Sequence, residues 1–516
     1  MKFVQNIVVT AAALFFLFSC VTSTVGSGKT LNINYDEYRQ EIDGFGGSNA
    51  WTRLPQDSEA AQEVVDLLFS RTKGMGFTIL RTRIPFRERL QDDNTPSHND
   101  GFIVRKSDNA YDYTVNADKT KTFNLNWNCW DIAGSKKLIE EIKNLGGDGP
   151  EKLVVMSAPW TPPNNRVTQW KEDVAGVNDR INGKINWNLP DVWGRLKKDK
   201  YEDYADLLAD YAKNFESNMG HPLSILSIQN EPNYKVNYES AYWSGTDLRD
   251  FIKIMEQRFP KKGVSFGEGG IGIMMPEYEN FGVNYNSMIK PSIDDPDSEK
   301  IITHIALHQY NGAYDSSPYA GSKAFPEIIE TGKRFWQTEV SGSGPQLPAG
   351  TGIDNALYYA RMIHFDMTMA QTNAFLYWWL WTGRADDNFP GSLIQVLDGD
   401  TVITAQRLFA MGQYSRFIRP GWYRIDCDTS PSHSVYSSAY RNPKTDEIAI
   451  VIINNKMTAD SVSLNLSGAE FSQLDIWRTS EKEKLSSVGR QKVSRNTANV
   501  SLPPKSVTTL YGTVVK

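Results

Sequence analysis

The sequence predicts an α/β protein, a closed (β/α)8 TIM barrel with an attached side β-sandwich formed mainly by the C-terminal region. Two patterns predict this fold. Over most of the chain, short apolar runs that end in small or polar residues alternate with longer helical stretches, as in parallel strands covered by helices. Beyond Pro420 the pattern changes to short alternating strands separated by turn residues, which is typical of an all-β domain.

Eight apolar runs fit the strands of such a barrel. In chain order they are residues 40–49, 78–84, 152–157, 224–230, 263–267, 302–308, 334–338 and 374–379. Helices are expected at residues 58–72, 132–145, 200–219 and 354–369. The intervals leave room for the roughly twelve residues that a right-handed crossover with its helix requires. Periodicity alone does not separate a closed barrel from an open doubly wound sheet. However, no G-x-G-x-x-G or G-K-S/T phosphate loop follows an early strand, which disfavours nucleotide-binding folds.

The expected domain plan has five parts. They are a signal peptide with a lipobox-like end (1–20), a tether (21–30), a first strand that joins the β-sandwich (31–40), the barrel (41–419) and the β-sandwich domain (420–516). Strands of the sandwich are expected at 434–441, 447–454, 460–465, 473–479, 499–501 and 506–514. Because these strands cannot bury both faces alone, the sandwich is expected to pack against the barrel.

The N-terminus has the features of a targeting segment. Lys2 provides a positive charge, an apolar run follows at residues 8–18, and Leu17-Phe18-Ser19-Cys20 resembles a bacterial lipobox. The resemblance implies cleavage before Cys20 and a lipid on its thiol, with ordinary secretion as the alternative. No later run of eighteen apolar residues exists, so membrane contact is expected through the N-terminal lipid anchor only. The expected location is secreted, as a bacterial cell-surface or periplasmic lipoprotein.

Composition narrows the class of ligand. A net charge of -6 and a pI near 5.7 provide no basic field that would gather phosphates, so nucleic acid is not expected as a partner. The 14 Trp and 23 Tyr residues favour a sugar, because an aromatic ring stacks on a sugar face while its polar edge stays hydrogen-bonded. Only Cys129 and Cys427 remain in the mature chain, and no C-x-x-C pair indicates zinc. We expect a monomer without cofactors that acts on a polysaccharide.

Two predicted strands end in a glutamate. Asn230 and Glu231 close the run 226–232, and Glu339 closes the run 335–341. The carboxyl ends of barrel strands carry the chemistry of barrel enzymes, so both side chains are expected at one mouth of the barrel. Acetal hydrolysis needs such a pair, about 5 to 5.5 Å apart in retaining enzymes. The alternative is that each glutamate only caps or salt-bridges a strand end.

Five ordered motifs sharpen this interpretation. They are Gly44-Phe45-Gly46-Gly47, Leu80-Arg81-Thr82-Arg83-Ile84, Ser157-Ala158-Pro159-Trp160-Thr161-Pro162-Pro163, Ile228-Gln229-Asn230-Glu231-Pro232 and Trp336-Gln337-Thr338-Glu339. Together they resemble glycoside hydrolase family 30, whose barrel carries a side β-sandwich. The resemblance implies double displacement, with Glu231 as the acid/base, Glu339 as the nucleophile and Asn230 as the donor to the sugar 2-hydroxyl.

Further residues are expected around this pair. Glu339 must stay ionised, and Arg81 and Tyr310 are candidate donors to it, although Arg81 fits a buried structural ion pair equally well. His308, at the end of the sixth strand, is expected to touch the substrate. His304 and His308 lie about 13 Å apart along a strand, and no H-E-x-x-H helix is present, so no metal site is expected.

Four tryptophans follow strand ends and are candidate sugar platforms: Trp51, Trp160, Trp379 and Trp381. Core packing is nearly as good an explanation for Trp379. Trp160 lies between Pro159 and Pro162 and is expected to be hard to bury fully.

The substrate is predicted from two further segments. Residues 238–246 and 412–421 most resemble the bacterial glucuronoxylanase branch of the family, which recognises a glucuronate side chain with an Arg and a Tyr after the eighth strand. Arg384 is the candidate here, although residues 379–387 depart from the usual pattern of that branch. An endo-β-1,4-xylanase acting on glucuronoxylan or arabinoxylan is therefore favoured. The alternatives are an endo-β-1,6-galactanase, an endo-β-1,6-glucanase, a β-glucosidase or glucosylceramidase-like enzyme, and a non-enzymatic surface glycan-binding lipoprotein, which the intact acidic pair disfavours.

Overall fold

The computed structural model describes most of the chain. The described residues are 29–86, 101–108, 110–174, 184–187, 189–310, 324–342, 350–383 and 391–515. The predicted signal peptide, including Cys20, lies outside them. No helix within these ranges is long and apolar enough to cross a membrane.

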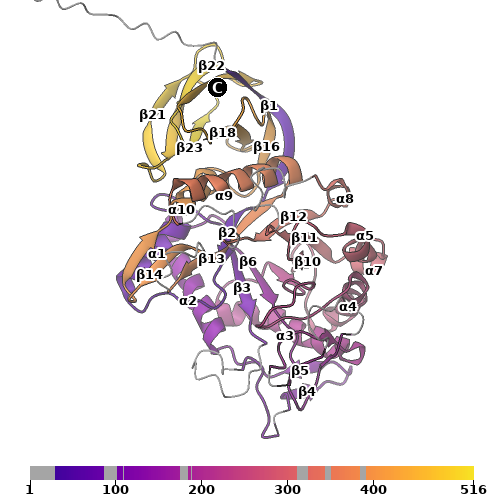
Figure 1. Ribbon diagram of the computed structural model, residues 1–516. Helices are drawn as coiled ribbons and strands as arrows, with labels where there is room; N and C mark the ends of the chain where they lie inside the picture. Colours follow the sequence, from indigo (N-terminus) through magenta and orange to yellow (C-terminus); the bar gives the residue numbers. More distant parts are fainter. Residues whose placement is uncertain are drawn as a thin grey trace, which may run out of the picture.

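In the described part of the chain, eight parallel strands close into a barrel (Figure 1). They are β2 (Gly44–Ser48), β3 (Ile79–Ile84), β6 (Val154–Pro159), β9 (Ile225–Ser227), β10 (Gly272–Tyr278), β11 (Ile302–His308), β12 (Arg334–Glu339) and β13 (Ala374–Thr382). Neighbours in chain order pair with one another, and β13 pairs with both β12 and β2, which closes the sheet. The predicted fold class is confirmed. A hairpin of β14 (Ser392–Leu397) and β15 (Thr401–Thr404) extends from β13.

The fifth strand lies later in the chain than predicted. The expected strand at 263–267 is wrong, because Gly263, Gly267 and Gly269 have φ angles of +79°, +74° and +77° and form turns. The strand is instead β10, whose Ile273, Met274 and Met275 are fully buried. This shift places Glu277 near the carboxyl end of a barrel strand.

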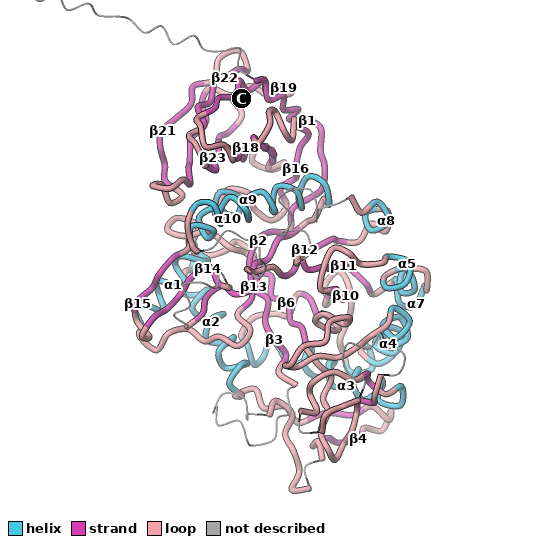
Figure 2. Tube along the Cα trace, in the orientation of Figure 1, coloured by secondary structure: helices cyan, strands magenta, loops and turns pink. Residues whose placement is uncertain are grey.

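Helices cover the outside of the barrel (Figure 2). The longer ones are α1 (Ser58–Phe69), α2 (Trp130–Asn144), α3 (Tyr201–Met219), α4 (Gly245–Arg258), α9 (Ile353–Phe365) and α10 (Gln406–Ser415). Single-turn helices follow β10 and β11: α5 (Tyr285–Met288), α6 (Lys290–Ile293), α7 (Pro296–Glu299) and α8 (Pro326–Ile329). Local signals explain their ends, since Asp57 caps α1 by accepting from two backbone N–H groups and α3 stops at Gly220, which has a φ of +71°.

Two small antiparallel pairs lie in the loops between barrel strands. One joins β4 (Tyr113–Val115) to β5 (Lys121–Phe123), and the other joins β7 (Lys171–Glu172) to β8 (Arg195–Leu196). The second pair belongs to the long segment after β6. The buried Lys171 amine donates to Thr161 Oγ1 at 2.8 Å and thus ties that segment to the end of β6.

A nine-stranded sheet forms the side β-sandwich, as predicted. Its strands are β1 (Lys29–Ile42), β16 (Trp422–Cys427), β17 (Val435–Arg441), β18 (Glu447–Asn454), β19 (Asp460–Ser467), β20 (Gln473–Thr479), β21 (Ser486–Lys492), β22 (Thr497–Leu502) and β23 (Ser506–Thr513). β1 joins this sheet through β16 and β19. The sequence did not predict β21, because its side chains are mostly exposed and lack the apolar alternation of a half-buried strand.

Helices α9 and α10 lie between the barrel and the sandwich (Figure 1). Side-chain hydrogen bonds hold α10 to the sheet: Thr509 Oγ1 donates to the Gln413 carbonyl at 2.7 Å, Gln413 Nε2 donates to Thr479 Oγ1 at 2.9 Å, and Thr479 Oγ1 lies 3.3 Å from the Phe409 carbonyl. These groups are buried, so the sandwich packs on the helical layer of the barrel as the sequence predicted.

Candidate active site

Glu231 and Glu339 meet at the mouth of the barrel. Glu231 lies four residues beyond the end of β9, and Glu339 is the last residue of β12. One carboxylate oxygen of each lies within 4.8 Å of the other, and they are 6% and 5% exposed. This approach fits the spacing of about 5 to 5.5 Å in retaining glycosidases and is shorter than the roughly 6.5 to 9.5 Å of inverting ones. Glu231 has a φ of +47°, a strained conformation for a non-glycine residue.

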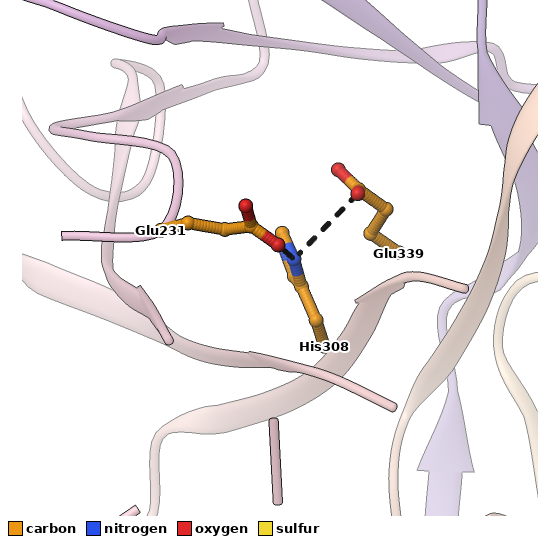
Figure 3. A group of neighbouring side chains, drawn as sticks. All are labelled: Glu231, His308 and Glu339. Carbon is orange, nitrogen blue, oxygen red and sulfur yellow. Dashed lines mark hydrogen bonds and ion pairs between the residues drawn. The ribbon is translucent and has the colours of Figure 1, made fainter. Parts of the chain in front are cut away.

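His308 lies between the two carboxylates (Figure 3). Its Nδ1 is 2.9 Å from Glu231 Oε1 and 3.8 Å from Glu339 Oε1. Burial alone would lower the pKa of His308, but the surrounding carboxylates outweigh it and raise the pKa to about 9. The ring is therefore an imidazolium at neutral pH, and its Nδ1–H donates to Glu231. The histidine is fully buried, so it acts on the acidic pair and not on a surface ligand.

Arg81 is the central cation of the site. Its guanidinium donates to Glu339 Oε2 at 2.7 Å and to Asn230 Oδ1 at 2.6 Å, and it lies 3.1 Å from Glu277 Oε1. Arg81 thus fulfils both alternatives that the sequence left open, as a donor to Glu339 and as a buried ion pair. Since Arg81 takes the oxygen of Asn230, the amide nitrogen is the group left for a sugar hydroxyl.

Tyr310 is the second donor to Glu339. Its hydroxyl donates to Glu339 Oε1 at 2.9 Å, and burial keeps the pKa of Tyr310 well above its usual value, so the donor stays protonated. Burial also raises the pKa of Glu339, and the nearby Glu231 adds to this, whereas His308 and Arg81 oppose the shift. The donors therefore counteract the desolvation of this carboxylate.

An aromatic cluster forms one wall beside Arg81. Trp160 lies 5.2 Å from Trp51 and 5.6 Å from Trp378 between ring centroids, and the Arg81 guanidinium lies 4.8 Å from the Trp160 ring. Trp160 is only 3% exposed, so the expectation that it is hard to bury is wrong. Trp51 and Trp379 are half-buried and keep an exposed part that a sugar can contact.

Trp381 does not fit the role of a sugar platform. It is 2% exposed, it packs in the core between barrel and helices, and its Nε1 donates to the Arg53 carbonyl at 2.9 Å. Tyr377 lies in the same outer core, whereas Leu376 packs inside the barrel and Trp378 packs against Trp160. The register of β13 against β2 shifts between Tyr377 and Trp379, so strict alternation does not predict where Trp381 lies.

Replacing Trp381 by Ala is therefore expected to lower the free energy of unfolding by about 3 to 5 kcal/mol, the usual cost of truncating a buried aromatic side chain. The substrate KM of the folded variant should stay unchanged. Urea unfolding and steady-state kinetics measure the two effects, and a raised KM without loss of stability would restore Trp381 as a binding residue.

Three residues of the site escaped the sequence prediction: Glu277, Trp378 and Tyr238. Glu277 closes the apolar run 273–277 and carries the same strand-end signal as Glu231 and Glu339. It was missed because the fifth strand was expected ten residues too early in the chain. Tyr238 is half-buried against Trp51, with ring centroids 5.9 Å apart, and burial raises its pKa, with a further rise from Glu231 and Glu339. Arg384 lies outside the described residues, so its contact with a glucuronate stays a prediction.

The same geometry raises the question of a metal ion. Glu231, His308 and Glu339 offer one ligand atom each within 4.8 Å of one another. However, Arg81 already donates to Glu339 Oε2 at 2.7 Å, and His308 Nδ1 is already in hydrogen-bond contact with Glu231 Oε1 at 2.9 Å. The donor set therefore favours a proton network over a metal site.

Prolonged incubation with EDTA, followed by dialysis, is expected to leave hydrolytic activity and the melting temperature unchanged. Added Zn²⁺ or Mn²⁺ should not raise the activity of the treated protein. A chelator-dependent loss that a divalent cation restores would contradict the proton network.

Known proteins match this chain both in its C-terminal domain and over nearly its full length. Residues 421–510 match the family model described as the glycosyl hydrolase family 30 beta sandwich domain. Glucuronoxylanase XynC of Bacillus subtilis is 25% identical over 488 residues, which cover 94% of this chain and 92% of that protein.

Solved structures resemble the chain over similar lengths. The glycoside hydrolase family 30 subfamily 8 xylanase Xyn30A from Clostridium acetobutylicum is 26% identical with a TM-score of 0.67, covering 94% of this chain and 99% of that one. A conserved exported protein from Bacteroides fragilis shares the fold at 20% identity and a TM-score of 0.71, covering 94% and 100%.

A TIM barrel with two convergent carboxylates and a side β-sandwich, together with these relatives, defines a class of protein: the chain is an O-glycosyl hydrolase. Within that class it resembles glycoside hydrolase family 30 and, there, the xylanase-like branch, which confirms the resemblance that the barrel motifs predicted.

Proposed function

We propose that the chain is a retaining endo-β-1,4-xylanase acting on glucuronoxylan or arabinoxylan, with Glu339 as nucleophile and Glu231 as general acid/base. The observation that carries the mechanism is the approach of the two carboxylates within 4.8 Å at the mouth of the barrel, although β10 and β11 separate β9 from β12. The xylan specificity is supported by the relatives described as a glucuronoxylanase and a xylanase, at 25% and 26% identity.

The mechanism follows from the contacts of the two acids. Glu339 attacks the anomeric carbon while Glu231 gives its proton to the departing oxygen, which forms a covalent glycosyl ester on Glu339. Glu231 then takes a proton from a water molecule that attacks the ester, and the product keeps the β configuration. Arg81 and Tyr310 hold the Glu339 oxygens at 2.7 and 2.9 Å, so the nucleophile is oriented before substrate binds.

Two cations, Arg81 and His308, lie among three carboxylates, Glu231, Glu277 and Glu339. One proton on the acidic pair therefore makes the group neutral, and the proposed assignment of that proton to Glu231 follows the family resemblance. The hydrogen bond from His308 Nδ1 fixes one Glu231 oxygen at 2.9 Å and leaves the other to carry the proton.

Digestion of four polysaccharides tests the substrate. Incubation with glucuronoxylan is expected to release a series of oligosaccharides early in the reaction, while β-1,6-galactan and β-1,6-glucan stay intact. Arabinoxylan is the fourth polysaccharide, and the E339Q variant is the inactive control. The sizes of the products are measured by chromatography. Exclusive cleavage of a β-1,6-linked glycan would contradict the xylanase assignment, and release of monosaccharide alone would contradict endo action.

Export with a lipid on Cys20 is a further part of the proposal. It rests on the sequence Leu17-Phe18-Ser19-Cys20 after an apolar run, and a secreted enzyme is supported by the similarity to an exported protein. We propose a monomer whose partner is its polysaccharide.

A further inference from the structure

A third carboxylate lies beneath the acidic pair. Glu277 on β10 is fully buried and has a φ of +50°. Its Oε1 lies 3.1 Å from Arg81 and 3.7 Å from His308 Nε2, and its Oε2 accepts from Ser227 Oγ at 2.6 Å. Without solvent exposure it cannot touch a sugar, so any effect on the reaction passes through its partners.

Glu277 also fixes the backbone around Glu231. The Glu231 N–H donates to the Glu277 carbonyl at 3.0 Å, which couples the turn after β9 to β10. Both residues have a positive φ, a conformation that costs of order 1–3 kcal/mol and persists only where the surroundings determine it. The two strained residues therefore support each other at the base of the site.

The charge of Glu277 is strongly stabilised. Burial alone would raise its pKa, but Arg81 and His308 outweigh burial and lower the pKa to about 2. The anion in turn helps both cations, which are fully buried like Glu277 itself, to stay charged. The groups that face His308 are Glu231 after β9, Glu277 on β10, Tyr310 on its own loop and Glu339 on β12. Of the three acids, only Glu277 is left without a chemical step in the reaction.

We propose that Glu277 is a positioning residue of this site: its carboxylate holds Arg81 against Glu339 and Asn230, and it holds His308 as a charged donor to Glu231. Through Arg81 it orients the nucleophile, and through His308 it orients the acid. The inference rests on the proposed function for the roles of Glu231 and Glu339, whereas the ion network itself does not depend on the substrate.

The test compares Glu277→Gln with the unmodified full-length protein. Glutamine keeps the size of the side chain and removes its charge. The kcat on glucuronoxylan is expected to fall about 100-fold, the usual loss when catalytic groups are slightly misplaced, with little change in KM. The alkaline limb of the pH profile of kcat/KM should move to lower pH, because an imidazolium without its buried anion loses its proton more easily. Glu277→Asp, which keeps the charge, should restore part of the activity.

A direct titration separates positioning from a merely structural role. Protein labelled with ¹³C at histidine Cε1 is titrated by NMR, and the His308 signal is assigned with a His308→Gln variant. In the unmodified protein His308 should titrate near pH 9. In Glu277→Gln the midpoint should fall by about two pH units.

A matched control removes a half-buried, ion-paired carboxylate from the other end of the barrel. Asp43 directly precedes β2, accepts from Trp336 Nε1 at 2.7 Å and lies 3.7 Å from Arg334. Asp43→Asn should lower the melting temperature without moving the His308 titration or the pH profile.

Two results would overturn the inference. One is a folded Glu277→Gln protein with an unchanged His308 midpoint and unchanged kcat. The other is a His308 midpoint at or below pH 6.5 in the unmodified protein, which decides the question even if the variant does not fold. If no glycan is cleaved, the proposed function fails, while the NMR titration still decides the role of Glu277.

Discussion

Replacement of Glu339 by Gln is expected to lower kcat on glucuronoxylan by at least about 10⁴-fold, because an amide cannot form the glycosyl ester on which double displacement depends. Glutamine has the same size, and its oxygen still accepts from Arg81 or Tyr310, which lie 2.7 and 2.9 Å from the native carboxylate. Folding and substrate binding should therefore survive. Steady-state kinetics, the melting temperature and calorimetric binding of xylo-oligosaccharides measure the three properties.

The control is Glu299→Gln on the outer helix α7. Glu299 forms an ion pair with Lys333 at 2.5 Å and is not part of the active site. This variant should keep full activity. A slow 2-fluoro-xylobioside substrate should also label Glu339 covalently, and peptide mass spectrometry should locate the label. Turnover by E339Q within tenfold of the unmodified protein, or a label on another carboxylate, would contradict the assignment.

Local signals made the acidic pair predictable from the sequence. A strand that ends in a buried glutamate is visible in a few consecutive residues, as in 226–231 and 335–339, and parallel strands of a barrel bring such ends to one mouth. The same signal existed for Glu277. It was lost because the predicted strand 263–267 includes Gly263 and Gly267, which form turns with positive φ.

Other parts of the site depend on register and could not be predicted. Arg81 has three partners on three other strands or their ends, and their distances follow from how β3, β9, β10 and β12 align around the barrel. The tryptophans of β13 show the same limit. The register of β13 against β2 shifts between Tyr377 and Trp379, so strict alternation of sides does not predict that Trp378 lies near Arg81 whereas Trp381 lies in the outer core.

The role of His308 also differs from the prediction, because it too depends on how the strands align around the barrel. The sequence placed it correctly at the end of the sixth strand and predicted contact with the substrate. In the fold it is fully buried, and it contacts Glu231 at 2.9 Å. Its pKa is raised by the combined effect of Glu231, Glu277 and Glu339, which lie on or after three other strands. No sequence pattern shows that these three acids surround one histidine.

Replacement of Glu231 by Ala is expected to lower kcat on glucuronoxylan by about 10²- to 10⁴-fold, the usual contribution of a general acid/base. The loss should be much smaller in the first step for a dinitrophenyl xyloside, because that leaving group departs without a proton. Steady-state and burst kinetics with the two substrates measure the difference. An equal loss on both would mean that Glu231 supports binding or folding rather than proton transfer.

Azide distinguishes the two acids by stereochemistry. In Glu231→Ala, azide enters the space left by the acid/base and attacks the glycosyl ester on Glu339 from the β face, so the expected product is a β-xylosyl azide. In Glu339→Ala, azide replaces the nucleophile on the opposite face and should give an α-xylosyl azide. The two carboxylates approach within 4.8 Å across one gap, so each truncation opens a site on its own face of the sugar. Proton NMR of the azides assigns the anomers, and an α product from Glu231→Ala would exchange the two roles.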